Sequence, residues 1–178
     1  MEQRQRTRML VEAGLCIAIA YVLHFIVLFQ MPQGGSVNAA NLVPLVIFSM
    51  RWGGKNGIFA CTMYGVIAFL LGAKFSLHYL SILLDYLVAY GVIGITGFFR
   101  DTPVGVIIGF VISTLLRWFA SVVSGAVVFA AYAPVGQNPW IYSMVYNATY
   151  MIPEFGINLI VILLFYVRIM RGINTSTR

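Results

Sequence analysis

The chain has 178 residues, of which 61% are hydrophobic and 9% are charged, and its mean hydropathy is +0.91. Soluble domains carry about 25% charged residues, so this composition excludes a water-soluble domain and predicts an integral membrane protein. The net charge of +6 would suggest a nucleic-acid partner in a soluble protein. In a membrane protein such an excess usually reports orientation, and we expect no nucleic-acid partner.

Glycine, proline and charged residues divide the chain into six apolar segments, each of which we expect to be a membrane-spanning helix. A helix needs about 20 residues to cross the hydrocarbon core, so the second segment is short for a crossing. It follows Gln33-Gly34-Gly35-Ser36, where tilting or partial unwinding is expected. The sequence therefore predicts an all-α fold in one membrane domain, residues 1–178, with helices at about 9–29, 37–51, 55–72, 79–99, 104–132 and 139–169.

Lysine and arginine residues are distributed unevenly between the two sides of this expected bundle. One, Lys74, falls on the outer side, and Arg117 lies within the fifth segment. Because cytoplasmic loops are enriched in basic residues, both termini are expected to be cytoplasmic. The outer connections are then 30–36, 73–78 and 133–138. The side with both termini holds nine basic residues: Arg4, Arg6, Arg8, Arg51, Lys55, Arg100, Arg168, Arg171 and Arg178.

Four polar or ionisable side chains fall within the later segments: Asp85, Arg117, Asn147 and Glu154. Such groups are costly inside a bilayer and are functional candidates by default. Counting residues from the outer ends places Asp85, Tyr86, Tyr142 and Asn147 in one layer, with Arg117 and Glu154 nearer the middle. A carboxylate beside aromatic rings suits a cationic ligand or one that carries an amino group. The alternative is that Arg117 merely neutralises Glu154 or Asp85 inside the bundle.

Enzyme motifs are absent from the sequence, and we expect neither catalysis nor a cofactor. Cys16 and Cys61 lie in apolar segments without metal or redox spacing, and His24 and His78 are far from other ligand-type residues, so no metal site is expected. Gly14 and Ala18 form a small-residue face on the first helix, against which another helix can pack closely, within the bundle or from outside it.

Several segments together resemble the thiamine-specific substrate-capture (S) components of energy-coupling factor (ECF) transporters. The similarity extends from Val11 to about Tyr166, with matching order and spacing. The matching segments are Met31-Pro32-Gln33-Gly34-Gly35-Ser36, Phe48-Ser49-Met50-Arg51-Trp52-Gly53, Leu84-Asp85-Tyr86-Leu87-Val88-Ala89, Leu116-Arg117-Trp118, Ser124-Gly125-Ala126 and Trp140-Ile141-Tyr142-Ser143 with Tyr146-Asn147-Ala148-Thr149-Tyr150.

The resemblance implies a six-helix protein of the bacterial plasma membrane that binds a vitamin in an outward-facing cavity. It also implies association with a transmembrane ECF coupling protein and two cytoplasmic ATPase subunits, with Gly14 and Ala18 as the docking face. By position, the family's acidic residue for the aminopyrimidine is Asp85, the aromatic residue that packs on the thiazolium is Tyr86, and the basic residue of the fifth helix is Arg117. The polar pair on the sixth helix is Tyr142 and Asn147.

This sequence departs from the family pattern at three positions. Ser121 stands where some relatives have histidine, Phe129 stands in place of a stacking tryptophan, and another tryptophan aligns near Gly35. Phe129 retains a stacking face, whereas Ser121 removes one hydrogen-bond partner of the pyrimidine. Thiamine is the favoured ligand, and hydroxymethylpyrimidine or another thiamine-related compound is the alternative.

Two other functions fit the residues. A solitary proton-coupled carrier would use Asp85 or Glu154 to take up the proton, and a structural subunit would use its polar residues only to hold helices together. In the favoured hypothesis, high-affinity vitamin capture, loops 30–36 and 73–78 act as a lid.

Overall fold

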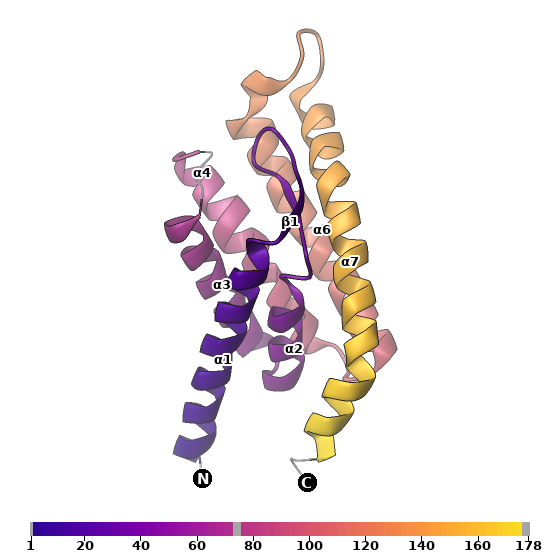
Figure 1. Cartoon of the computed structure of the whole chain (residues 1–178). Helices are drawn as coiled ribbons and strands as arrows, with labels where there is room; N and C mark the ends of the chain where they lie inside the picture. The colour runs from indigo at the N-terminus through magenta and orange to yellow at the C-terminus, as the bar shows by residue number, and fades with distance from the viewer. Residues whose placement is uncertain (1, 73–75, 176–178) are drawn as a thin grey trace.

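The structure is a computed structural model that describes residues 2–72 and 76–175, with side chains for residues 3–72 and 76–166. Lys74, Arg178 and part of the 73–78 loop, which enter the predictions above, lie outside the described residues, as do the side chains of Arg168 and Arg171. Figure 1 shows an elongated helical bundle with both termini at the same end. We call the half of the molecule away from the termini the outer half.

Six helical segments build the bundle. Five are long and apolar enough to cross a membrane, and α2, with 10 residues, is shorter. The expected all-α membrane fold with six passes and cytoplasmic termini is confirmed. The helices are α1 (Glu2–His24), α2 (Val43–Trp52), α3 (Gly54–Leu71), a composite of α4 (Tyr79–Ser81), η1 (Ile82–Val88), α5 (Ala89–Gly91) and η2 (Val92–Phe98), then α6 (Pro103–Val128), the short η3 (Ala130–Tyr132) and α7 (Pro139–Thr175).

A two-stranded hairpin replaces the expected end of the first helix and the expected start of the second. Strands β1 (Val27–Gln30) and β2 (Ser36–Asn38) pair antiparallel, and the hairpin extends into the outer half in Figure 1. A continuous apolar run does not by itself distinguish a helix from a strand. Here Gly34, with a φ of 96°, reverses the chain, and pairing satisfies backbone groups that would otherwise be costly in a bilayer.

Glycines allow the composite helix to pack closely against α3. A Cβ atom at Gly94 would overlap the backbone of Gly57 and Ile58, and one at Gly65 would overlap the backbone of Tyr86. Small residues of this kind let membrane helices approach each other. This segment is π-helical over η1 and 3-10 helical over η2, so Asp85 lies on the π-helical stretch.

Helix α1 lies at the edge of the bundle. Near the termini, the Glu12 carboxylate joins it to α2, because Oε2 accepts a hydrogen bond from Trp52 Nε1 at 2.7 Å and lies 3.1 Å from Arg51 Nε. Gly14 and Ala18 are both exposed, and no heavy atom lies within 4 Å of a Cβ built at Gly14. The small-residue face therefore points away from the bundle.

The inner half, nearer the termini, contains the main apolar core. Side chains of α2, η2, α6 and α7 meet there with little exposed area, among them Leu45, Ile93, Phe110 and Ile162. The N-terminus of α6 is fixed by Thr102, whose Oγ1 accepts a hydrogen bond from Gly105 N at 3.0 Å, and by Pro103 in the first turn. This core supports the outer half, where α6 and α7 continue beside a cavity.

Candidate ligand-binding cavity

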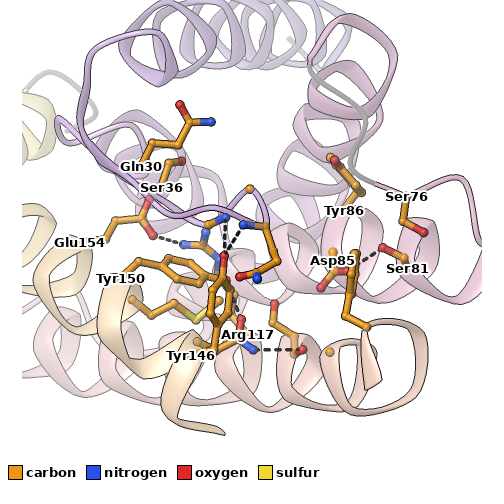
Figure 2. A pocket seen from close by; sticks show the side chains of 18 of the residues that line it. Gln30, Ser36, Ser76, Ser81, Asp85, Tyr86, Arg117, Tyr146, Tyr150 and Glu154 are labelled. Atoms are coloured by element: carbon orange, nitrogen blue, oxygen red, sulfur yellow. Dashed lines mark hydrogen bonds and ion pairs between the residues drawn. The ribbon is translucent and has the colours of Figure 1, made fainter. Parts of the chain in front are cut away.

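A cavity of about 220 Å³ lies in the outer half of the bundle. A water molecule takes up about 30 Å³ of liquid volume, so the cavity has room for a small organic molecule. Its wall combines the hairpin with residues of α3, η1, α6 and α7 (Figure 2). All seven side chains that the sequence singled out as ligand-binding candidates line it: Asp85, Tyr86, Arg117, Ser121, Phe129, Tyr142 and Asn147.

Asp85 is half-buried in the wall and is held by two serine hydroxyls. Ser81, one turn earlier, donates to Oδ2 at 2.8 Å, and Ser124 of α6 donates to the same oxygen at 2.5 Å. Removing a carboxylate from water is costly unless hydrogen bonds compensate. Asp85 thus remains a polar acceptor within an otherwise apolar helix.

Arg117 forms an ion pair with Glu154, which decides between the two partners left open by the sequence. Its Nη1 lies 2.8 Å from Glu154 Oε2, and both side chains are buried. The guanidinium also lies over the ring of Tyr90, 5.1 Å from the centroid. Figure 2 shows this pair across the cavity from Asp85 and Tyr86.

Asn147 is fully engaged with neighbouring groups of the protein. Its Oδ1 accepts from the Tyr150 hydroxyl at 2.6 Å, and its Nδ2 donates to Ser143 O at 2.9 Å and to Ser121 O at 3.4 Å. Ser143 in turn donates to Val122 O at 2.9 Å. The bonds to Ser121 O and Val122 O connect α7 to α6, whereas those to Tyr150 and Ser143 lie within α7. Asn147 therefore supports the cavity as well as lining it.

Two tyrosines that were not among the candidates contribute to the cavity. Tyr146 and Tyr150 follow Tyr142 at intervals of four residues, a spacing that places side chains on one helix face. The Tyr146 hydroxyl accepts hydrogen bonds from Gln33 N at 3.1 Å and Gly35 N at 3.4 Å. Their four-residue spacing was the signal in the sequence that would have placed the three tyrosines on one face of the helix.

The hairpin supplies a second group of lining residues. The sequence analysis expected loop 30–36 to act as a lid but placed residues 25–29 and 37–38 in helices, so it missed Val27 and Asn38. Asn38 is buried, and its Nδ2 lies 2.7 Å from His24 Nδ1. Gln30 and Ser36 also line the cavity. A Cβ at Gly35 would approach the Tyr150 ring to 2.5 Å, so the turn packs directly on α7 where a tryptophan of some relatives aligns.

Aromatic rings provide apolar faces at the cavity. Tyr86 packs edge-on against Phe69, with ring centroids 5.2 Å apart, and the ring centroids of Phe129 and Tyr132 are 6.0 Å apart. Tyr142 and Tyr146 stack with centroids 6.0 Å apart. Rings in such positions attract cations and stack on heteroaromatic ligands.

The charged groups of the cavity have an acidic balance. Among the described lining residues, two carboxylates, Asp85 and Glu154, face one guanidinium, Arg117, so the formal charge is −1. Within the described part of the chain, no three His, Cys, Asp or Glu side chains form a metal-binding group, and both cysteines are free. The arrangement is suited to binding an organic cation.

Comparison with known proteins gives consistent matches over nearly the whole chain. The family model described as "Thiamine transporter protein" matches residues 10–174. The thiamine transporter ThiT of Bacillus subtilis (strain 168) is 38% identical over 93% of this chain and 94% of its own length. A thiamine transporter ThiT of Lacticaseibacillus paracasei is 26% identical over 83% of this chain and 81% of its own length.

A solved structure of ThiT from Listeria monocytogenes superposes with a TM-score of 0.81 at 22% identity, covering 95% of this chain and 98% of that one. This likeness shows a shared fold. The named relatives are transport proteins rather than enzymes, and the multi-pass fold agrees with a bacterial plasma-membrane protein. The extent of the family match and the identity to the Bacillus subtilis protein together show that the chain belongs to the thiamine transporter family.

Proposed function

We propose that the protein is the high-affinity capture subunit of a thiamine uptake transporter and binds thiamine in an outward-facing cavity. The observation that carries this proposal is the cavity itself, where Asp85 and aromatic rings meet under an acidic charge balance. Thiamine has a cationic thiazolium and an aminopyrimidine, which match a ring face and a carboxylate acceptor respectively. Membership of the thiamine transporter family supports the same ligand.

In this proposal the aminopyrimidine lies at Asp85, with Tyr142 and Asn147 beside it, and the thiazolium packs on Tyr86. Phe129 adds a further ring face, and Ser121 borders the pyrimidine. Arg117 does not bind the ligand in this proposal. Its guanidinium pairs with Glu154 at 2.8 Å, and the pair stabilises the cavity wall. The hairpin, which Tyr146 fastens at Gln33 and Gly35, acts as the lid.

The energy for uptake comes from other chains in this proposal. The sequence has no P-loop, and the exposed Gly14 and Ala18 on α1 offer a small-residue face for a transmembrane partner. An ECF coupling protein would dock there and would carry two ATPase subunits on the cytoplasmic side.

A titration of the detergent-purified chain with thiamine tests capture. Trp118, which packs in the same cluster as Tyr146 and Tyr150, serves as the fluorescent reporter, and hydroxymethylpyrimidine and riboflavin are the comparison ligands. We expect saturable quenching by thiamine alone. Quenching by the pyrimidine alone would identify the precursor as ligand, and no response to any of the three would contradict vitamin capture.

Asp85→Asn is the matching variant. We expect its thiamine affinity to fall by about 30-fold or more, since an ionised acceptor is lost, while its circular dichroism spectrum stays that of the wild type. Wild-type affinity in this variant would refute the role of Asp85. Uptake by vesicles that contain this chain alone, driven by a pH gradient, would refute the need for ATPase partners.

A further inference from the structure

Two serine hydroxyls converge on one oxygen of Asp85. Ser81 lies one helical turn before Asp85, and Ser124 lies on α6, which faces η1 across the wall of the cavity. Both donate to Oδ2, at 2.8 Å and 2.5 Å, and both serines are at most 3% exposed. Neither of these two bonds involves the second carboxylate oxygen, Oδ1. A third serine, Ser121 in the cavity wall, also interacts with the Asp85 carboxylate.

Ser124 stands behind the cavity wall. The neighbouring Ser121 and Gly125 on α6 line the cavity, as do Ser81 and Asp85, whereas Ser124 is not among the described lining residues. Ser124 is fully buried, so any influence that it has on a ligand passes through Asp85.

The chemistry of the bond determines what that influence is. A carboxylate has only acceptor sites and a serine hydroxyl supplies one donor, so each serine presents its proton to Asp85. A hydrogen bond to an ionised acceptor is about twice as strong as a neutral one. Two such bonds at Oδ2 fix the rotation of the carboxyl group about the Cβ–Cγ bond.

We propose that Ser124 is a positioning residue that sets the ligand selectivity of the cavity, because it holds the Asp85 carboxyl group with Oδ1 presented to an amino group. This inference rests on the proposed function. A ligand with an amino group on its pyrimidine ring can donate to Oδ1, whereas a ligand with a carbonyl at that place presents a second acceptor and is rejected. Ser124 thus acts on selectivity at this atom from outside the cavity, whereas Ser81, which donates to the same oxygen, lines it.

The test compares thiamine with oxythiamine, in which a carbonyl replaces the pyrimidine amino group. Dissociation constants of both are measured by tryptophan fluorescence for the wild type, S124A and S124T. The matched control is S113A, because Ser113 is equally buried on α6 but donates to the backbone oxygen of Gly109. S81A is the second variant and removes the other bond to Oδ2.

We expect S124A to weaken thiamine binding by about tenfold and oxythiamine binding by less than threefold. The preference for thiamine over oxythiamine therefore falls. S124T keeps the hydroxyl and should restore the preference, and S113A should leave it unchanged. S81A should lower the preference in the same direction. If S124A does not fold, S81A and S124T carry the comparison.

Equal weakening of both ligands in S124A and S81A would overturn the inference, since a merely structural serine affects both alike. An unchanged thiamine affinity in both variants would overturn it as well. These results leave the proposed function intact. A wild-type chain that binds neither thiamine nor oxythiamine would instead refute the proposed function, and the inference with it.

Discussion

The two sides of the cavity are held in place by different means. Between α6 and α7 lie a buried ion pair, Arg117 with Glu154 at 2.8 Å, and the bonds of Asn147 to Ser121 O and of Ser143 to Val122 O. The hairpin is fastened to α7 by two neutral bonds from backbone amides to the Tyr146 hydroxyl, at 3.1 and 3.4 Å.

This difference separates a firm wall from a movable one. Breaking a buried ion pair leaves an uncompensated charge in an apolar medium, whereas the amides at a hairpin turn can exchange a hydroxyl for water at small cost. Elements that open to admit a ligand are drawn from the less stable parts of a structure. We therefore expect the α6–α7 wall to keep its shape while the hairpin opens.

The largest effect should come from removing one member of the buried ion pair. Glu154→Ala leaves Arg117 unpaired, and we expect the free energy of unfolding in detergent to fall by about 3–5 kcal/mol. The measurement is a denaturation curve followed by circular dichroism. The control is Arg117→Met with Glu154→Leu, which removes both charges and should recover most of the loss. Equal loss in the single and double variants would show that the pair does not hold the wall.

A smaller effect is expected where α6 and α7 touch. A Cβ at Gly125 would overlap Ser143 Oγ, and moving that hydroxyl breaks its bond to Val122 O. Gly125→Ala should therefore lower the free energy of unfolding by about 1–3 kcal/mol and weaken thiamine binding.

The matched control for this contact is Gly156→Ala on α7, where nothing lies within 4 Å of the added Cβ. Alanine is the better helix former by about 1 kcal/mol, so this variant should be at least as stable as the wild type. Destabilisation by both substitutions would mean that the helices tolerate neither change and that the contact at Ser143 is not special.

Weakening the attachment of the hairpin should mainly change the rate of ligand release. Tyr146→Phe removes the acceptor of the two amides, and we expect a loss of about 1 kcal/mol in the closed state, which corresponds to about fivefold faster thiamine dissociation in stopped-flow. Hydrogen exchange of the Gln33 and Gly35 amides without ligand should also speed up. Tyr79→Phe is the control, because Tyr79 is 76% exposed. Unchanged exchange at Gly35 would contradict a lid fastened by Tyr146.

The smallest effect on the chain itself is expected on the outer face of α1. Gly14→Leu meets no atom within 4 Å, so stability and thiamine affinity should change by less than about 0.5 kcal/mol. Uptake by cells that supply the coupling protein and ATPases should nevertheless be lost if this face docks. Normal uptake by Gly14→Leu would place the docking surface elsewhere.

Much of the site was predictable because polar groups are conspicuous in an apolar sequence. Asp85, Arg117 and Asn147 stand out by their cost in a bilayer. Counting residues from the outer ends of the helices puts Asp85 and Asn147 at the level of Tyr86 and Tyr142, with Arg117 nearer the middle. Ser124 was not predictable as a partner of Asp85, since serine is common in membrane helices and its role depends on which helix lies opposite. Loop 30–36 was expected as a lid, but the strands that flank it were missed because the apolar run from Leu10 to Phe29 gives no sign of where the helix ends.

The sequence by itself determined the membrane class, the number of passes and the orientation, because these follow from hydropathy, segment length and charge, which act locally along the chain. The tertiary structure alone decided which charges pair, where the strands form and which oxygen of Asp85 the serines hold. Those features depend on atoms of segments distant in sequence, such as Ser124 and Asp85 or Arg117 and Glu154. A hydrogen bond requires donor and acceptor within about 3.2 Å, and an ion pair strengthens as its charges approach, so only the packed helices specify them.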